Sequence, residues 1–451
     1  MTFFSARSAL AQLPRIPLHA DTVRTLHSAS EYRQELLMQI AQAKHRIYLC
    51  SLYLQHDEAG AEILAALYAA KAARPSLDVR VLVDWHRAQR GLIGAGKQNG
   101  NAVWYQQQSR LHVGSVPIYG VPVQTRELFG VLHLKGFVID DLTIYSGASL
   151  NNVYLHKLDK YRHDRYLLLQ NATLANSMVQ FIQEHILASA AVHRLDVVAI
   201  PSTRSIKRDI RSFRANLKRA HYLVPLSRIG QSGLPHELSV TPLLGVGKNN
   251  PLNRIICQLL GAAQTQITIC TPYFNFPLAV TREINRALKR GVTIDIIVGD
   301  KTANDFYIPP EEPFKIIAAL PYLYESNLRR FAKAHQAEID GQQLRLHLWR
   351  DGINTYHLKG LWVDHDYSLM TGNNLNPRAF RLDLENALLI HDPEQVLAQQ
   401  RQLELTSIYQ HASQISHYTS LEKLTDYPQE VRKLLSRLSR TRLDFFAARV
   451  L

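Results

Sequence analysis

Two stretches of the chain, about 220 residues apart, read alike, and this internal repeat limits the fold more than any other feature of the sequence. Residues 43–60 (AKHRIYLCSLYLQHDEAG) and 263–280 (AQTQITICTPYFNFPLAV) both contain an apolar run typical of a buried strand. Tyr53 in the first stretch matches Tyr273 in the second. A helical pattern and a second, β-branched strand that ends at an aspartate follow each stretch. The order β-α-β therefore occurs twice, which predicts two similar α/β halves.

The repeat predicts an α/β protein with two tandem α/β sandwich halves related by pseudo-twofold symmetry. The 451 residues are enough to give each half its own core. The predicted segments are an N-terminal segment at 1–19, a first half at 20–195, a basic helical linker at 196–237, a second half at 238–410 and a C-terminal basic amphipathic helix at 411–451.

Two segments outside the halves carry basic and apolar residues at helical spacing. Residues 204–221 combine seven Lys or Arg with Ile206, Ile210, Phe213 and Leu217, and a similar pattern begins at Pro428. Two interpretations stay open for each helix. The helix either docks on the core with a solvated basic face, or anchors the protein at a membrane surface, where apolar burial and attraction to anionic lipid act together.

The charge balance indicates a polyanionic partner. Lys and Arg number 52 and Asp and Glu number 38, which leaves a net charge of +14. Either an anionic membrane surface or a nucleic-acid particle such as the ribosome fits this charge. No apolar run reaches the ~18 residues that span a bilayer, and residues 1–20 lack a secretion signal. We therefore expect a cytoplasmic protein that contacts the inner face of the cytoplasmic membrane peripherally.

The cysteines exclude two further classes of site. Cys50, Cys257 and Cys270 form no CxxC pair and are odd in number, which argues against a disulfide framework and against a cysteine-built zinc site. We expect a reducing compartment, no bound metal and no cofactor.

The strongest chemical signal is the pattern H-x-K-x4-D, which occurs once in each half. On a strand, the His and the Lys of this pattern lie on one face, and the Asp has the opposite parity. The residues predicted to face a substrate are His133 and Lys135 in the first half and His357 and Lys359 in the second. The two aspartates, Asp140 and Asp364, are predicted to bond the backbone or a buried partner.

Two His-Lys pairs brought face to face could exchange phosphodiesters or phosphoanhydrides without a metal. One imidazole can attack phosphorus while the other donates a proton to the leaving group. The two ammonium groups would neutralise the phosphoryl oxygens. Either histidine alone would be interpreted as a hydrogen-bonded core residue, but duplication of the whole pattern disfavours that interpretation.

With these two motifs the chain resembles the phospholipase D-like superfamily, whose members fold as paired α/β halves and act through a phosphohistidine. The superfamily pattern continues with a Gly and an Asn, which correspond here to Gly147 with Asn151 and to Gly372 with Asn374. The resemblance also implies that Glu385 orients an active-site histidine. Asp164 is its looser counterpart in the first half.

Longer segments narrow the resemblance to the bacterial phosphatidylserine synthases of this superfamily. They include VRVLVDWHRAQRG at 79–91, VTPLLGVGK at 240–248, IIVGDKTANDFYIP at 296–309 and FKIIAALPYLYESNLRRF at 314–331. The resemblance implies that CDP-diacylglycerol and L-serine give phosphatidylserine and CMP. It also implies that His133 attacks phosphorus, and that His357 protonates CMP and then deprotonates serine. Lys135, Lys359 and the asparagines would hold the phosphoryl oxygens.

Further candidates for substrate binding lie after strand ends, where sites gather in α/β folds. The first-half candidates are Trp85, His86, Arg87 and Arg90, and the second-half candidates are Lys301, Asn304 and Tyr307. These residues could equally belong to ordinary surface loops. The segments after the two motifs add Ser149, Asn376 and Arg378. No pattern identifies the groups that bind serine or the acyl chains, or the oligomeric state.

Three alternative functions share some of these features. A cardiolipin synthase or a phospholipase of the D type would use the same motifs with another acceptor. A phospholipase D-like nuclease would also fit the basic charge, although no other nucleic-acid signature is present. A basic binding module without activity would not depend on His133.

Overall fold

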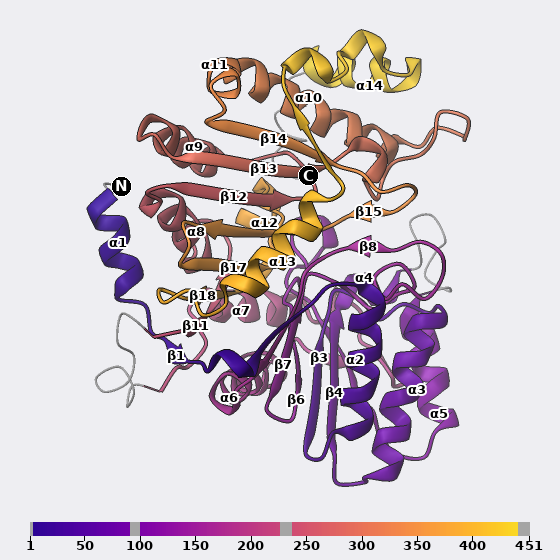
Figure 1. Cartoon of the computed structure of the whole chain (residues 1–451). Helices are drawn as coiled ribbons and strands as arrows, with labels where there is room; N and C mark the ends of the chain where they lie inside the picture. The colour runs from indigo at the N-terminus through magenta and orange to yellow at the C-terminus, as the bar shows by residue number, and fades with distance from the viewer. Residues whose placement is uncertain (1–2, 91–99, 226–236, 441–451) are drawn as a thin grey trace.

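The first half is built on an eight-stranded mixed sheet. The structure is a computed structural model and describes residues 3–90, 100–225 and 237–440 (Figure 1). The strands of this sheet lie in the order β10 (His193–Arg194), β5 (Ile118–Val121), β4 (Asp78–Asp84), β3 (Arg46–Cys50), β6 (Phe137–Ile139), β7 (Leu142–Ser146), β9 (Tyr166–Gln170) and β2 (Val23–Leu26). Only the pairs β3–β4 and β4–β5 are parallel.

The second half repeats this arrangement strand for strand and adds one edge strand. The order is β19 (Ala412–Ile415), β14 (Leu344–Trp349), β13 (Thr293–Gly299), β12 (Gln266–Thr271), β16 (Gly360–Val363), β17 (Tyr367–Thr371), β18 (Leu384–His391), β11 (Ser239–Val246) and β1 (Ile16–Pro17). Again only two pairs, β12–β13 and β13–β14, are parallel. The predicted duplicated α/β fold is confirmed, because two sheets with the same order and the same directions arise from the two repeats.

Helices cover both faces of each sheet. The first half has α2 (Ala29–Gln42), α3 (Glu58–Ala73), α4 (Trp85–Gln89), α5 (Asn101–Leu111) and α6 (Ala172–Phe181). The second half has α8 (Pro251–Ala262), α9 (Leu278–Lys289), α10 (Leu320–Ala334), α11 (Gln336–Asp340), α12 (Pro377–Arg381) and α13 (Ala398–Tyr409). Cover on both faces explains why the central strand β3 reads as an unbroken apolar run, with Ile47, Tyr48 and Leu49 fully buried.

Polar caps fix where the repeated helices begin. The Asp57 carboxylate accepts a hydrogen bond from the backbone N–H of Gly60 and starts α3. Asn250 caps α8 through the N–H of Asn253, and Pro251 follows at the first helical position.

The N-terminal segment joins both halves. Helix α1 (Phe3–Ala11) places Ala6 and Leu10 in the apolar core of the second half, next to α8. Strand β1 then pairs with β11, and β2 enters the sheet of the first half.

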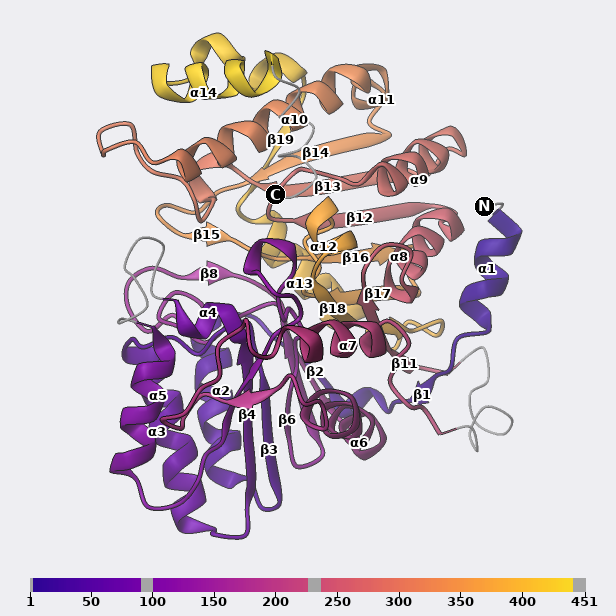
Figure 2. The ribbon, with the colours of Figure 1, turned by 180° about the vertical axis from the view of Figure 1, so that it is seen from behind.

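The basic segment between the halves forms α7 (Lys207–Leu217), which crosses the back of the molecule where the halves meet (Figure 2). Its apolar residues Ile210, Phe213 and Leu217 are buried, and its Lys and Arg side chains are mostly exposed. Arg214 donates a hydrogen bond of 3.0 Å to the carbonyl of Leu382 in the second half. The helix is therefore docked on the core.

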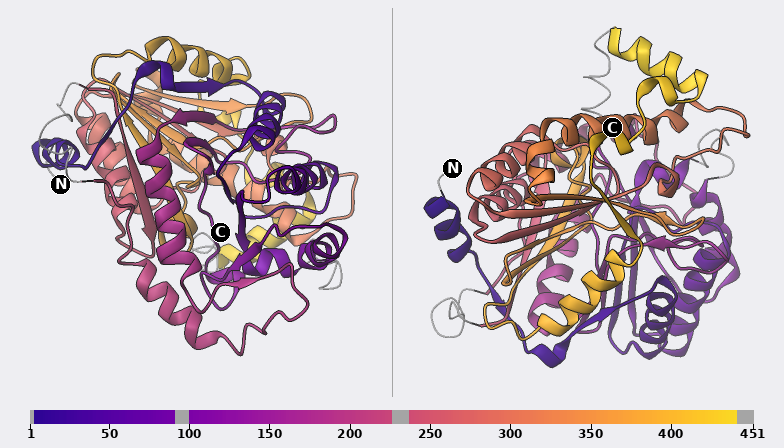
Figure 3. Two further views of the ribbon diagram at one scale, coloured as in Figure 1. Left: turned by 90° about the horizontal axis from the view of Figure 1, so that it is seen from below. Right: turned by 45° about the horizontal axis from the view of Figure 1, so that its top comes forward.

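The last described helix, α14 (Gln429–Arg440), lies at the outer edge of the second half (Figure 3, right). Val431 and Leu435 are buried against Tyr322 and Leu323 of α10, while Arg432 is exposed. Residues 441–451 of the predicted C-terminal helix lie outside the described residues, as do 1–2 and linker residues 226–236. No helix in the described ranges is both long and apolar enough to cross a membrane.

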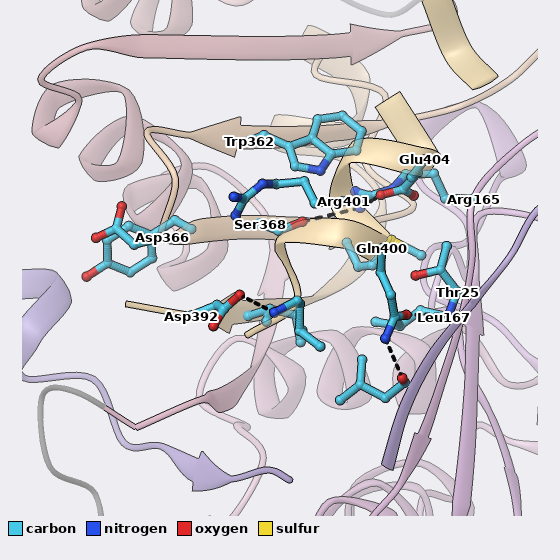
Figure 4. A pocket seen from close by; sticks show the side chains of 15 residues that line it. Thr25, Arg165, Leu167, Trp362, Asp366, Ser368, Asp392, Gln400, Arg401 and Glu404 are labelled. Atoms are coloured by element: carbon cyan, nitrogen blue, oxygen red, sulfur yellow. Dashed lines mark hydrogen bonds and ion pairs between the residues drawn. The ribbon is translucent and has the colours of Figure 1, made fainter. Parts of the chain in front are cut away.

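A buried ion pair holds the two halves together around a small cavity of about 50 Å³ (Figure 4). The Arg165 guanidinium donates to both carboxylate oxygens of Glu404, at 2.6 and 2.9 Å, and to the carbonyl of Leu369 at 3.0 Å. It also lies 4.0 Å from the ring centroid of Trp362. Arg165 belongs to the first half and its partners to the second, so the halves are fixed relative to one another.

Candidate active site

Both H-x-K-x4-D motifs border one cleft between the halves. The cleft has a volume of about 950 Å³, and His133, His357, Asn151 and Asn374 line it. The cleft contains residues of both halves, as the predicted pseudo-twofold arrangement requires.

Short parallel strand contacts between the halves assemble the site. The pair β15 (Thr355–Tyr356) and β8 (Arg162–His163) immediately precedes His357 and Asp164. On the other side of the cleft, a parallel bridge between Leu132 and Leu384 immediately precedes His133 and Glu385. Each histidine is therefore brought beside an acid of the opposite half.

His133 is bonded to the acid supplied by the second half. Its Nδ1 lies 2.9 Å from both carboxyl oxygens of Glu385. Burial lowers the pKa of the His133 imidazole well below its ordinary value, and the charge of Lys135 adds to this effect. Burial also raises the pKa of Glu385 to about 8, although the two motif lysines oppose the shift. The uncharged forms of both His133 and Glu385 are therefore favoured. Nδ1–H of His133 donates to the carboxyl group of Glu385, and Nε2 of His133 keeps its lone pair.

His357 has a richer set of partners. Its Nδ1 lies 3.0 Å from Oδ2 of Asp164, and the Tyr154 hydroxyl lies 3.0 Å from its Nε2. The Lys359 ammonium contacts the same ring and lies 3.6 Å from Asp164. Burial, followed by the Lys359 charge, lowers the pKa of His357 well below its ordinary value. A neutral His357 can therefore accept a proton, and a bound anion would favour its protonated form.

The two motif lysines are almost completely buried. Lys135 donates to the carbonyl of Ala148 at 3.2 Å and to Oγ of Ser149 at 3.4 Å. Burial lowers the pKa of Lys135 to about 8, and the charge of Lys359 contributes. Burial likewise lowers the pKa of Lys359 to about 8, against the opposing effect of Asp164. Two ammonium groups so close together are suited to an anionic ligand.

The glycines after the motifs permit close approaches across and within the halves. A Cβ at Gly147 would lie 2.8 Å from the carboxylate of Asp164. A Cβ at Gly372 would lie 2.8 Å from Cγ of Lys135. Side chains at these positions would displace an acid that contacts His357 and a lysine of the site.

The motif aspartates do not line the cleft, but strand parity is not the reason: β6 and β16 begin after the His and the Lys of each motif, and Asp140 and Asp364 follow these strands in turns with positive φ. Asp140 accepts hydrogen bonds from the backbone N–H groups of Lys44, His45 and Arg46 at 2.7–3.0 Å. Asp364 accepts the equivalent bonds from residues 264–266. Burial opposes the shift, but the three backbone donors lower the pKa of Asp140. Each aspartate connects its motif strand to the start of the repeated central strand.

The remaining sequence candidates divide into two groups. Arg87, Arg90, Asn376 and Arg378 line the cleft together with the histidines. Ser149 is buried beneath Lys135.

Besides Ser149, five candidates for substrate binding lie outside the cleft lining. Trp85 is fully buried and donates to Thr203, and His86 contacts the carbonyl of Gln124. Lys301 pairs with Glu325 and Glu422. Asn304 is buried and accepts a hydrogen bond from the N–H of Phe306. Tyr307 packs near Tyr322. The strands that precede these residues end next to the cleft, but the five side chains bond to or pack against neighbouring loops and helices.

Sequence reasoning missed several residues of the cleft wall, notably Tyr154, Arg162 and Asp305. Tyr53 and Tyr273 also line the cleft, and their match between the two repeats was the one available signal. Tyr154 and Asp305 stand in turns and Arg162 in the two-residue strand β8, and the repeat seen in the sequence covers none of these segments.

Comparisons with known proteins agree with this architecture. A family described as "Cardiolipin synthase, PLD-like domain" matches residues 36–184 and 256–407. The CDP-diacylglycerol–serine O-phosphatidyltransferase of Escherichia coli (strain K12) is 53% identical over 98% of this chain and 97% of its own length. The enzyme of the same name from Haemophilus influenzae is 51% identical over 97% of both chains.

A solved structure is similar over the whole length. The crystal structure of phosphatidylserine synthase from Haemophilus influenzae Rd KW20 matches with a TM-score of 0.96 and 49% identity, covering 100% of both chains. The chain therefore belongs to the bacterial phosphatidylserine synthases of the phospholipase D-like superfamily.

Proposed function

We propose that this chain transfers the phosphatidyl group of CDP-diacylglycerol to L-serine through a phosphatidyl-histidine intermediate, giving phosphatidylserine and CMP. The observation that carries the proposal is the pairing of each motif histidine with an acid of the opposite half in one cleft. Relatives that share half of all residues carry the corresponding enzyme name.

In the first step, Nε2 of His133 attacks the phosphatidyl phosphorus, and the bond from that phosphorus to the oxygen of CMP breaks. His357 donates a proton to the departing oxygen. Burial, together with the charge of Lys359, lowers the pKa of His357 and favours its neutral form. Negative charge on the bound pyrophosphate would favour its protonated form, so the acid becomes available once substrate is in place.

In the second step, the roles are reversed. Neutral His357 takes the proton of the serine hydroxyl, and the serine oxygen attacks phosphorus as the bond to Nε2 of His133 breaks. Lys135, Lys359 and the cleft asparagines stabilise the phosphoryl oxygens in both steps. Water competes with serine, so the acceptor must be held in position.

This ping-pong scheme predicts that labelled CMP exchanges into CDP-diacylglycerol in the complete absence of serine. The first step alone is reversible and needs no acceptor, which is why exchange isolates it. The measurement is incorporation of labelled CMP with and without serine, with phosphatidylserine identified as the product when serine is present. Exchange that strictly requires serine would contradict the scheme. Labelled phosphatidylglycerol as acceptor and labelled DNA as substrate test the cardiolipin synthase and nuclease alternatives.

The lysine pKa values predict a fall of exchange activity at alkaline pH. Each ammonium has a pKa of about 8, so it is charged below pH 8 and loses its proton as the pH rises through 8. Glu385 titrates in the same range, so the fall in exchange activity reports the coupled titration of Lys135, Lys359 and Glu385 and not the titration of one lysine. We expect kcat/KM for CMP exchange to fall above about pH 8. Exchange without serine avoids titration of the serine amine, and a flat profile to about pH 9.5 would argue against charged lysines in the reaction.

We further propose that the protein binds anionic membranes with the mouth of the cleft facing the bilayer. In the first half Leu128 and Phe129 are 52% and 43% exposed, and in the second half Phe314 and Ile316 are 39% and 76% exposed. Leu128 and the neighbouring Ile317 line the cleft itself, so this apolar rim continues into the site. An apolar rim at the entrance would let lipid acyl chains reach the site from the membrane.

The membrane proposal predicts that Leu128→Asp combined with Ile316→Asp lowers binding to phosphatidylglycerol vesicles at least about tenfold, because two exposed apolar side chains lose their burial in lipid. Sedimentation with vesicles measures this effect. Val113→Asp is the matched control, since Val113 is 93% exposed and absent from the cleft lining. Equal vesicle binding by the wild type, the double variant and the control would show that the rim does not contact the membrane.

A further inference from the structure

A partly buried pair of opposite charges lies in the cleft wall beside His357. Nη2 of Arg162, from the first half, lies 2.8 Å from Oδ1 of Asp305, from the second half. Their side chains are 14% and 13% exposed, and both line the cleft. The Oδ1 atom of Asp305 is buried, and apart from this ion pair it accepts no hydrogen bond from the described residues.

Two tyrosines connect this pair to the proposed base. The Arg162 guanidinium lies 4.5 Å from the ring centroid of Tyr154, whose hydroxyl is bonded to His357. On the other side, the Tyr273 hydroxyl donates to Oδ2 of Asp305 at 3.0 Å, and the Tyr273 ring meets the His357 ring edge-on. A small molecule that presents a hydroxyl to His357 can therefore place its other groups near Arg162 and Asp305.

A carboxylate at this position is not explained by the chemistry of the phosphoryl group. CDP-diacylglycerol is anionic, and a nearby carboxylate repels it. The combination of a carboxylate and a guanidinium instead matches a molecule with an ammonium and a carboxylate on neighbouring atoms, such as an amino-acid zwitterion.

A second Arg-Asp pair lines the cleft, but its charged groups are already hydrogen-bonded to the protein backbone. Arg378 and Asp383 lie on the His133 side of the cleft. The Asp383 carboxylate accepts from the N–H of Val131 at 3.0 Å, and Arg378 donates to the carbonyl of Glu127 at 2.9 Å. Arg90 and Glu127 form a further ion pair in the cleft lining, but among the described residues it is the pair at Arg162 that contacts the tyrosines beside His357.

We propose, on the basis of the proposed function, that Arg162 and Asp305 form the serine subsite. Arg162 binds the α-carboxylate and Asp305 binds the α-ammonium. Serine enters after CMP has left, and its hydroxyl then points to His357. The pair thus selects an amino acid over water and over lipid alcohols.

Asp305→Asn and Arg162→Gln test the subsite. Each change removes one charged hydrogen-bonding partner of serine, so we expect kcat/KM for serine to fall about 10- to 100-fold. The loss in kcat/KM for serine should exceed the loss in serine-independent CMP exchange by at least tenfold. Glu422→Gln is the matched control, because Glu422 pairs with Lys301 outside the cleft lining.

Serine analogues give the decisive pattern. With 3-hydroxypropionate, which lacks the ammonium, Asp305→Asn should have nearly the same kcat/KM for the acceptor as the wild type. With ethanolamine, which lacks the carboxylate, Arg162→Gln should likewise have nearly the wild-type kcat/KM. Equal losses with serine and with both analogues would overturn the subsite while leaving the proposed function intact. A wild-type reaction that forms no phosphatidylserine would overturn the proposed function and the subsite with it.

Discussion

Replacing His133 by alanine is expected to abolish exchange of CMP into CDP-diacylglycerol, with a loss of at least about 10³-fold. His133 is the imidazole whose Nδ1 is fixed by Glu385, so that Nε2 is the atom available for attack. Without it, no covalent intermediate forms and both half-reactions stop. Exchange and phosphatidylserine synthesis should therefore fall together.

Loss of folding must be separated from loss of the nucleophile in this experiment. His347→Ala is a suitable control, because His347 is also a buried histidine bonded to a carboxylate, Asp295, but it does not line the cleft. Comparable melting temperatures for the two variants, with exchange lost only in His133→Ala, is the expected outcome. Exchange above about a tenth of the wild-type rate in His133→Ala would assign the attack to another group.

His357→Ala is expected to lower phosphatidylserine synthesis about 10²- to 10⁴-fold, but to spare the first step when the leaving group is good. p-Nitrophenolate departs without a proton, and CMP, whose phosphate has a second pKa of about 6, is also a good leaving group, so the first step depends on His357 less than the attack of serine does. A phosphatidic acid p-nitrophenyl ester should therefore release about one equivalent of p-nitrophenol per site. Turnover should then stop, because no base activates serine.

The burst distinguishes the role of His357 from that of His133. In His133→Ala the same ester should give no burst, since the nucleophile itself is missing. If His357→Ala turned over the ester at the wild-type steady rate, His357 would not be the base of the second step. If it gave no burst while remaining folded, His357 would have a function in the first step other than proton donation.

The duplicated fold and the identity of the central site residues were accessible from the sequence. Strand periodicity around Cys50 and Cys270 located the two central strands, and the two motifs marked the strands next to them. The expected parity separated His133, which lines the cleft, from Asp140, which bonds the backbone, although His133 and Lys135 precede β6 and do not lie on it.

The rest of the cleft depends on contacts that no local pattern encodes. Asp164 reaches His357 only because β8 pairs with β15 across the halves. Arg162 and Asp305 meet by the same contact, although 143 positions separate them. Lys301 and Tyr307 looked equivalent in sequence, yet the partners that draw them out of the cleft come from α10 and the segment before α14.

The amphipathic helices show a related limit. Periodicity in 204–221 and from Pro428 onward identified an apolar face, but it could not say whether protein or lipid covers that face. In α7 and in the described part of α14 the apolar face is buried against the core. The exposed apolar residues near the cleft, Leu128 and Ile316, lie in 3-10 helices of three and four residues, which are too short to show an apolar periodicity.

The central claim is that phosphatidyl-His133 forms on the reaction path, and trapping that species is its most direct test. The enzyme is mixed with CDP-diacylglycerol labelled at the phosphatidyl phosphate, without serine, and is quenched and digested. The account predicts acid-labile label on the peptide that contains His133, and transfer of that label to phosphatidylserine when serine is added before the quench. Phosphatidylserine formed in a single turnover while the protein stays unlabelled, or label on a peptide without His133, would contradict it.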